Sequence, residues 1–182
     1  FIVDTSGSMR NPGTGNFWPA VIEKVDEVLD VYPEILGIQI LDADGRFILG
    51  RSGQQWLSDT GENRAAIKQA LRRYDIFSNS NPVPGIYQAI NRLHEPENLQ
   101  MKMGIYVFGD EFTGTADVVL RQLDRLNPAG EDGNRSIVIN AVGFPTAVRY
   151  YLNPANTGLK YANLMREVCY VHGGAFIALR DL

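Results

Sequence analysis

The chain has 182 residues, of which 45% are hydrophobic and 21% charged, a composition typical of a globular protein with a sizeable core. Its net charge of −4 argues against a nucleic-acid-binding surface, which would need clustered Lys and Arg. No uncharged apolar run approaches the length of about 18 residues that a membrane-spanning helix needs, and a single cysteine, Cys169, excludes an internal disulfide.

The chain opens on an apolar segment, residues 1–3, that is typical of the second half of a buried strand. We therefore expect a segment of a longer protein, folded as one domain over residues 1–182. Polar residues follow at once, from Asp4 to Ser8, and then a Gly-, Pro- and Asn-rich loop over residues 11–16. No targeting segment is visible, so the sequence leaves the compartment open.

A helix and a hairpin are predicted next. Apolar residues at helical spacing predict a helix from Trp18 to Tyr32. The hairpin consists of a strand over residues 35–41, a turn at residues 43–45 and a returning strand over residues 47–49. The turn is not an EF-hand calcium loop, because Phe47 and Leu49 stand where oxygen ligands would be needed.

Helical and strand-like segments then alternate to the end of the chain, with a loop predicted over residues 77–85. This pattern predicts an α/β fold: doubly wound, with a mostly parallel central sheet, one antiparallel edge strand and helices on both faces. In such sheets, ligands bind beyond the carboxyl ends of the strands, where the strand order reverses. The predicted helices cover residues 67–74, 86–93, 115–126 and 161–169, and the predicted strands cover residues 103–108, 137–142 and 175–179.

The turn after the first strand carries one carboxylate and two hydroxyls, on Asp4, Ser6 and Ser8. Gly7 lets the backbone fold so that the three oxygens converge. A hard cation such as Mg²⁺ prefers oxygen ligands and usually keeps some waters. A second carboxylate, Asp110, follows the strand over residues 103–108 and joins the set if the two strands are neighbours. A cation held through hydroxyls and waters stays electron-poor, and it therefore attracts an outside carboxylate.

Asp4-x-Ser6-x-Ser8 after an apolar strand resembles the metal-ion-dependent adhesion site of von Willebrand factor A domains. The resemblance covers essentially the whole chain. The segment 107–110 resembles the strand that carries the family's distal aspartate, 140–144 a later core strand, and 164–176 the last helix and strand. The resemblance implies a Rossmann-like fold and a metal-dependent protein-binding function, in adhesion or in the assembly of a complex.

The resemblance also implies roles for individual residues. Ser6 and Ser8 would bind Mg²⁺ directly, with Mn²⁺ or Ca²⁺ as alternatives, while Asp4 and Asp110 would act through water or hydrogen bonds. A glutamate or aspartate of a protein partner would take the open coordination position.

Two departures from the family pattern concern the edge of this site. The family's third hydroxyl comes from a threonine, but this chain has no Thr between Thr60 and Thr113. Alignment of the family's helix start on Gly85-Ile86 places Ser80 there, with Ser78 as the fallback. Glu111 stands where the family usually has glycine; it either tunes the site electrostatically or faces solvent, and we expect it to face solvent. The loops 11–16, 77–85 and 111–114 would form the rim that sets specificity.

Two other classes of function remain as alternatives. The first is an enzyme, either an aspartic protease or an Mg²⁺-dependent hydrolase or phosphotransferase that uses Asp4. However, the chain is helix-rich, has no Walker loop, and places neither His94 nor His172 at an evident strand end, so we expect no catalysis. The second is an interaction scaffold without metal, which the missing threonine favours and the intact Asp4, Ser6, Ser8 and Asp110 set disfavours.

Overall fold

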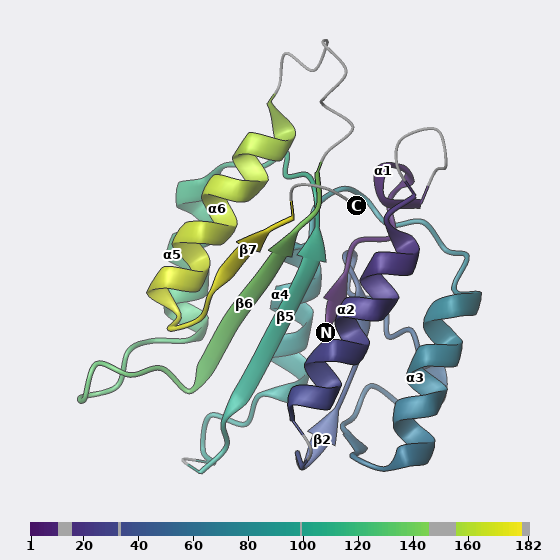
Figure 1. The fold of residues 1–182 in the computed structure, drawn as a ribbon. Coiled ribbons are helices and arrows are strands. Elements are labelled where there is room, and N and C mark those ends of the chain that lie inside the picture. The colour runs from purple at the N-terminus through teal and green to yellow at the C-terminus, as the bar shows by residue number, and fades with distance from the viewer. Residues whose placement is uncertain (11–15, 33, 99, 146–155, 180–182) are drawn as a thin grey trace.

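The computed structural model describes the whole chain except residues 11–15, 33, 99, 146–155 and 180–182, and its strands and helices alternate along the described sequence (Figure 1). None of the described helices is both long and apolar enough to cross a bilayer. The elements are β1 (Ile2–Val3), α1 (Gly7–Arg10), α2 (Trp18–Val31), β2 (Gly37–Ile38), β3 (Leu41–Asp42), the 3₁₀ helix η1 (Gly50–Ser52), β4 (Leu57–Ser58), α3 (Gly61–Arg73), α4 (Val83–Leu93), β5 (Met103–Gly109), α5 (Ala116–Leu126), β6 (Ile137–Gly143), α6 (Thr157–Val171) and β7 (Phe176–Ala178).

The central sheet is parallel throughout its described part. Five described strands form it in the order β3-β1-β5-β6-β7. β1, the first strand in the sequence, therefore lies between β3 and β5. Val3 of β1 pairs with Asp42 of β3 on one side and with Phe108 of β5 on the other. The strand order therefore reverses at the junction of β1 and β5, which confirms the doubly wound topology.

Among the described residues, antiparallel pairing is limited to a separate small sheet and to one bridge at β3, an edge strand of the central sheet. β2 pairs with β4, which the sequence did not predict because only Trp56 and Leu57 mark it as apolar. The predicted returning strand over residues 47–49 forms only in part: Phe47 makes a single antiparallel bridge to Leu41, and the Ile48 N–H donates to the Ile40 carbonyl at 3.0 Å. The predicted turn does form, with the Asp42 N–H donating to the Arg46 carbonyl at 2.9 Å.

The predicted strand over residues 35–41 is divided by Gln39. Its buried side chain accepts a hydrogen bond from the Ile40 N–H at 2.9 Å and donates one to the Gln55 carbonyl at 2.5 Å. A side chain that bonds the neighbouring backbone competes with strand pairing. β2 and β3 are accordingly two short strands that belong to different sheets.

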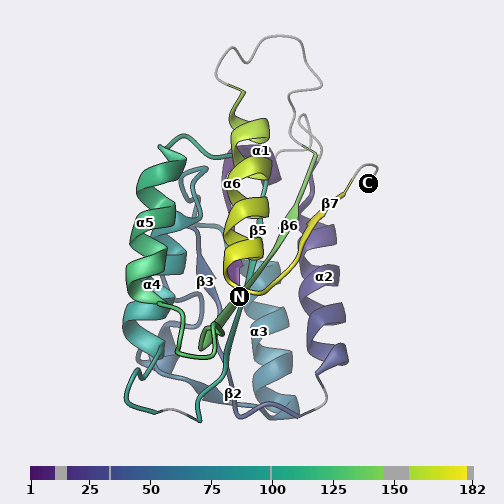
Figure 2. The same ribbon diagram turned by 90° about the vertical axis from the view of Figure 1, so that its left-hand side faces the viewer.

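Helices cover both faces of the central sheet, as predicted. In Figure 2, α4 and α5 lie on one side of the sheet, and α2 and α3 lie on the other. The buried residues form one core cluster that includes α4, α5 and α6, and a second that includes α2 and α3. Figure 1 shows that α2 and α3 leave β6 and β7 open on their face, where Val138 is 37% and Ile177 58% exposed.

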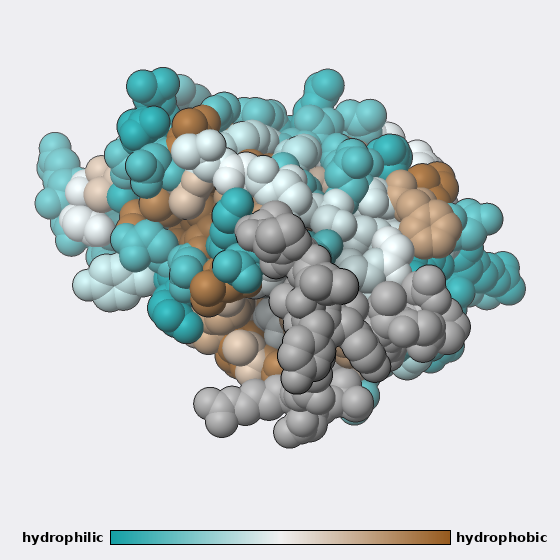
Figure 3. All heavy atoms as spheres, turned by 90° about the horizontal axis from the view of Figure 1, so that it is seen from above, coloured by the Kyte–Doolittle hydropathy of each residue, from teal (hydrophilic) through white to brown (hydrophobic). Residues whose placement is uncertain are grey.

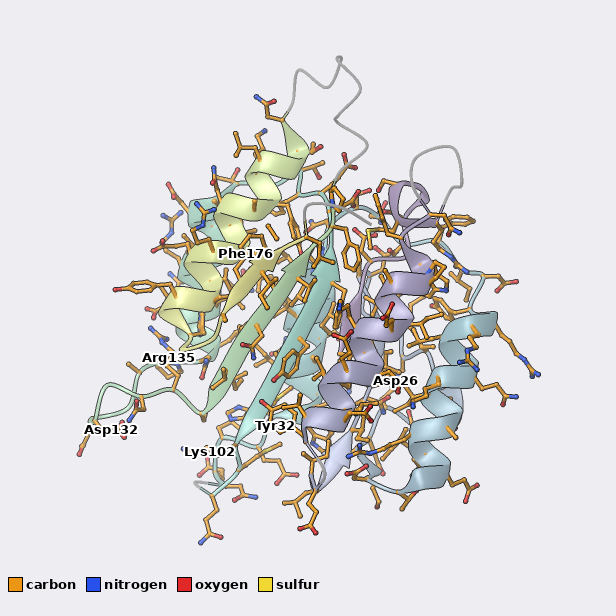
Figure 4. All side chains as sticks on the ribbon, viewed as in Figure 1. Asp26, Tyr32, Lys102, Asp132, Arg135 and Phe176 are labelled. Atoms are coloured by element: carbon orange, nitrogen blue, oxygen red, sulfur yellow. The ribbon has the colours of Figure 1, made fainter. Side chains whose placement is uncertain are left out.

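α2 is fixed against β5 and β6 by aromatic contacts at both of its ends. Phe17, which precedes the helix, packs on Phe144 with the ring centroids 5.8 Å apart. Tyr32, labelled in Figure 4, follows the helix, and its hydroxyl lies 2.7 Å from that of Tyr106 in β5. α1 lies above the carboxyl edge of the sheet (Figure 1).

Candidate functional site

Asp4 and Asp110 follow the two neighbouring strands at which the strand order reverses. The Asp4 N–H donates to the Phe108 carbonyl at 2.8 Å, so the pairing of β1 with β5 continues into the first residue of the turn. Both carboxylates are buried, Asp4 at 0% and Asp110 at 1% exposure. The structure thus brings together the two acidic residues that the sequence predicted to meet.

A chain of hydrogen bonds through the two serines joins these carboxylates. Asp4 Oδ1 accepts from the Ser6 N–H at 2.8 Å, which closes the turn. The Ser6 and Ser8 hydroxyl oxygens lie 3.0 Å apart, and the Ser8 hydroxyl donates to Asp110 Oδ1 at 3.1 Å. Because the Ser8 proton points to Asp110, Ser6 is the donor to Ser8. All four residues therefore belong to one polar cluster, which we call the Asp4–Asp110 cluster.

A glycine at the end of β5 allows this close approach. A Cβ atom on Gly109 would lie 3.3 Å from Asp4 Cβ and 3.2 Å from the ring of Tyr161. Contacts of that length are tighter than ordinary packing, so a larger residue would separate β5 from the first turn.

Each carboxylate keeps one oxygen without a partner. Asp4 Oδ2 and Asp110 Oδ2 are buried and have no hydrogen-bond partner among the described residues, and the same holds for the Thr5 hydroxyl. Buried polar atoms of this kind are rare in folded proteins, and each one destabilises the fold unless a proton, a water or an ion satisfies it.

The electrostatics of the cluster favour a positive charge. Burial, together with the negative charges of Asp4 and Glu111, raises the pKa of Asp110 to about 8. Burial also raises the pKa of Asp4 to about 6, against the opposing effect of its hydrogen bonds from Ser6. Two neighbouring carboxylates away from water therefore need protons or a cation.

The donor atoms present suit a hard divalent cation. They are carboxylate and hydroxyl oxygens, which Mg²⁺, Mn²⁺ and Ca²⁺ accept, whereas softer metals prefer thiolate and imidazole ligands. Within the described residues, no group of three or more His, Cys, Asp or Glu side chains has a metal-binding arrangement. A cation at this position would consequently depend on serine hydroxyls in addition to the two aspartates.

Ser78, rather than Ser80, supplies the hydroxyl that reaches the first turn. Ser78 is 9% exposed, and its Oγ accepts a hydrogen bond from the Thr5 N–H at 3.0 Å, while Ser80 is partly exposed. The prediction that preferred Ser80 placed the helix start at Gly85-Ile86. α4 in fact begins at Val83, two residues earlier, and a shift of two residues moves the expected position from Ser80 to Ser78.

Glu111 does not simply face solvent, so that prediction was wrong. The side chain is partly buried, and its Oε1 accepts a hydrogen bond from the Thr157 hydroxyl at 2.7 Å. The next residue, Phe112, donates its N–H to the Thr157 carbonyl at 3.1 Å. No local pattern indicated this contact, because Thr157 is 46 residues away and begins α6.

The structure describes two of the three loops that were predicted to form the rim of the site. The segment 111–114 directly follows Asp110, and Ser78 of the segment 77–85 bonds to the first turn. Residues 11–15 of the first predicted rim loop lie outside the described residues. Surface hollows of about 500 Å³ and about 530 Å³ lie elsewhere, over α2 and α3, and Arg72 lines both.

Comparisons with known proteins identify the fold. No model of a known protein family and no curated protein matches the sequence. Among solved structures, a von Willebrand factor type A protein from Catenulispora acidiphila matches with a TM-score of 0.68 and 19% identity, covering 99% of this chain and 38% of that chain.

Two Bacteroides structures are similar over nearly their whole length. The conserved hypothetical protein BatB from Bacteroides thetaiotaomicron matches with a TM-score of 0.60 and 12% identity, covering 100% of this chain and 89% of that one. An aerotolerance-related membrane protein from Bacteroides fragilis matches with a TM-score of 0.59 and 14% identity, covering 99% and 90%. The fold of this chain is therefore that of a von Willebrand factor A domain.

Proposed function

We propose that this chain is a protein-binding module that holds a divalent cation at the Asp4–Asp110 cluster and binds its partner through that cation. The observation that carries the proposal is the pair of buried carboxylates, each with one oxygen left without a partner and joined by two serine hydroxyls. Mg²⁺ is the first candidate, with Mn²⁺ or Ca²⁺ as alternatives.

The residues divide into ligands and supports in this proposal. The hydroxyls of Ser6 and Ser8 are the direct ligands, and Asp4 and Asp110 supply negative charge through hydrogen bonds or water. Ser78 is the preferred third hydroxyl, because it is the serine of its loop that bonds to the first turn.

The partner is proposed to present an aspartate or glutamate. When bound, the cation would supply a positive charge with an open coordination position, which an acidic side chain can fill. The contact would lie in a partly dry crevice, where charge interactions are stronger than in open water. The fold similarity is compatible with such a binding role, and adhesion and assembly of a complex are both consistent with it.

Thermal unfolding with Mg²⁺ or with EDTA tests the cation. We expect Mg²⁺ at a hundredfold excess over its Kd to stabilise the wild-type chain by about 2 to 3 kcal/mol, because only the folded state binds the ion. Ser6→Ala should abolish this effect, while Ser58→Ala, at an exposed position in β4, should retain it. Equal stability of the wild-type chain in Mg²⁺ and in EDTA would favour a scaffold without metal.

We also propose that the chain catalyses no reaction by itself. His94 and His172 follow α4 and α6, and they bond to Ser136 and Asn127 near the start of β6, at the edge of the sheet opposite to Asp4. This arrangement leaves the Asp4–Asp110 cluster without a histidine base. Turnover of p-nitrophenyl phosphate that disappears in Asp4→Asn would contradict the proposal.

A further inference from the structure

Two exposed apolar side chains lie beside the cluster, immediately before the serine that bonds to the first turn. Ile76 is 47% and Phe77 61% exposed, and Ser78 follows them in the chain. Figure 3 looks onto the carboxyl edge of the sheet and shows a small group of hydrophobic side chains at its right-hand rim. We call Ile76, Phe77 and the neighbouring Arg10 the Phe77 patch.

Hydrogen bonds hold the backbone of this segment in place. Ser78 Oγ accepts from the Thr5 N–H, and the Phe77 carbonyl accepts from Arg46 Nη1 at 3.4 Å. The backbone N–H and the side-chain amide of Asn79 both donate to Asp44 Oδ1, at 3.2 and 2.9 Å. The segment is therefore preorganised, with Ile76 and Phe77 at the surface rather than in the core.

Arg10 fixes the ring of Phe77 from behind. Its guanidinium carbon lies 4.7 Å from the centroid of the Trp18 ring and 5.6 Å from that of Phe77, and one of its N–H groups donates to the Tyr74 carbonyl. Stacking of a guanidinium on aromatic rings is favourable, and it stabilises Phe77 in its exposed position. Arg10 also places a positive charge two residues after Ser8, with the carboxylate of Asp75 close enough to act on it.

The patch and the cluster are close enough to contact one short peptide segment. Consecutive Cα atoms are about 3.8 Å apart. Phe77 is directly followed by Ser78, whose Oγ lies 3.0 Å from the Thr5 nitrogen in the first turn. An extended peptide advances about 3.3 Å per residue, so about three residues of it can span a separation of this order between the first turn and Phe77. Arg10 adds a positive charge beside Phe77, and together with the proposed cation it favours a partner that is acidic next to its apolar residue.

We propose that the Phe77 patch is a second contact for the protein partner, and that the partner's binding segment carries a bulky apolar side chain within a few residues of its acidic one. This inference rests on the proposed cation-dependent function and names the class of partner. Ile76 and Phe77 bind the apolar side chain, while the cluster binds the acidic one. Exposed aromatic side chains held in a fixed position commonly contribute much of the binding energy of an interface.

Selection from a displayed library of random linear peptides tests this inference. The wild-type chain is panned in parallel in MgCl₂ and in EDTA, and the peptides enriched in MgCl₂ are synthesised. We expect them to contain Asp or Glu with Phe, Tyr, Trp, Leu or Ile nearby. Phe77→Ser should weaken their binding at least about tenfold. Val118→Ser, at a position 52% exposed on α5, is the matched control and should leave binding unchanged.

The outcomes separate this inference from the proposed function. Two results would overturn the proposed role of the Phe77 patch and leave the proposed cation-dependent binding in place. One is that the enriched peptides carry an acidic residue without any apolar preference, and the other is that they bind the Phe77→Ser variant with equal affinity. Peptides that bind equally in EDTA and still depend on Phe77 would overturn the proposed function and keep the apolar contact. A library that yields no binding peptide counts against both. Mg²⁺-dependent stability of the Phe77→Ser variant, measured alongside, shows that its fold and cluster are intact.

Discussion

Asp110 shows at the scale of one residue why the cluster favours a cation. Its side chain is buried, one of its oxygens has no partner among the described residues, and burial raises its pKa to about 8. Without a cation the carboxyl group therefore keeps its proton at neutral pH. A cation that interacts with Asp110 must displace this proton, so metal binding and protonation are linked at this residue.

Replacement of Asp110 by asparagine should stabilise the metal-free chain and abolish the effect of Mg²⁺. Asn removes the cost of a buried ionisable group while keeping its shape, and we expect a gain of about 1 to 2 kcal/mol in EDTA. Urea unfolding of Asp110→Asn in EDTA and in MgCl₂ measures both effects. Asp30→Asn, at an exposed position near the end of α2, is the control and should change neither quantity. A variant that is less stable in EDTA yet still responds to Mg²⁺ would contradict this account of Asp110.

The pH dependence of stability provides a second prediction for the same residue. An unfolded chain releases the Asp110 proton near pH 4, whereas the folded chain holds it to about pH 8. Between these values the folded state binds more protons, so its stability in EDTA falls as the pH rises. From pH 6.5 to 8 we expect the free energy of unfolding of the wild-type chain to fall by about 1 kcal/mol relative to that of Asp110→Asn.

The difference between the two chains is needed because other groups act in the opposite direction. Burial lowers the pKa of His172 to about 4 and that of the Phe1 amino group to about 5. Their unfolded forms bind more protons, so both contributions increase stability as the pH rises. Subtraction of the variant's profile cancels them. A difference that stays constant from pH 6.5 to 8 would rule out the raised pKa.

At the scale of elements, the longer helices were predictable, whereas the division and pairing of the short strands β2, β3 and β4 were not. The apolar spacing of Val21, Val25 and Leu29 identifies α2 almost to the residue, because a helix is built from local contacts. β4 has two residues and exists only through its pairing with β2, which local sequence does not encode. The two-residue difference in the start of α4 then changed the predicted third hydroxyl from Ser78 to Ser80.

The loop before α4 provides a prediction at this scale. Ser78→Ala removes the hydroxyl that bonds to the Thr5 N–H, and we expect it to weaken Mg²⁺ binding about tenfold or more. Ser80→Ala should leave the affinity unchanged, because Ser80 is the partly exposed serine of the same loop. Isothermal titration of Mg²⁺ into each variant compares the two serines. Weaker Mg²⁺ binding in Ser80→Ala alone would instead support Ser80 as the third hydroxyl, as the sequence alignment predicted.

At the scale of the whole molecule, the site depends on strand order. Asp4 and Asp110 are 106 positions apart in the sequence, and they meet because β1 and β5 are neighbours. The sequence predicted parallel strands and a reversal of their order, but it contained no information on which strands pair. The Asp4–Asp110 cluster was therefore predicted conditionally, and the contact of Glu111 with Thr157 was missed, because both depend on tertiary packing.

Proton release on Mg²⁺ binding tests the central claim most directly. Calorimetric titration at pH 7 in two buffers of different ionisation enthalpy measures both the binding and the number of protons released. We predict that Mg²⁺ binds the wild-type chain with release of about one proton, and that Asp110→Asn shows neither binding nor release. Absence of Mg²⁺ binding to the wild-type chain, or binding that is unchanged in Asp110→Asn, would contradict the account.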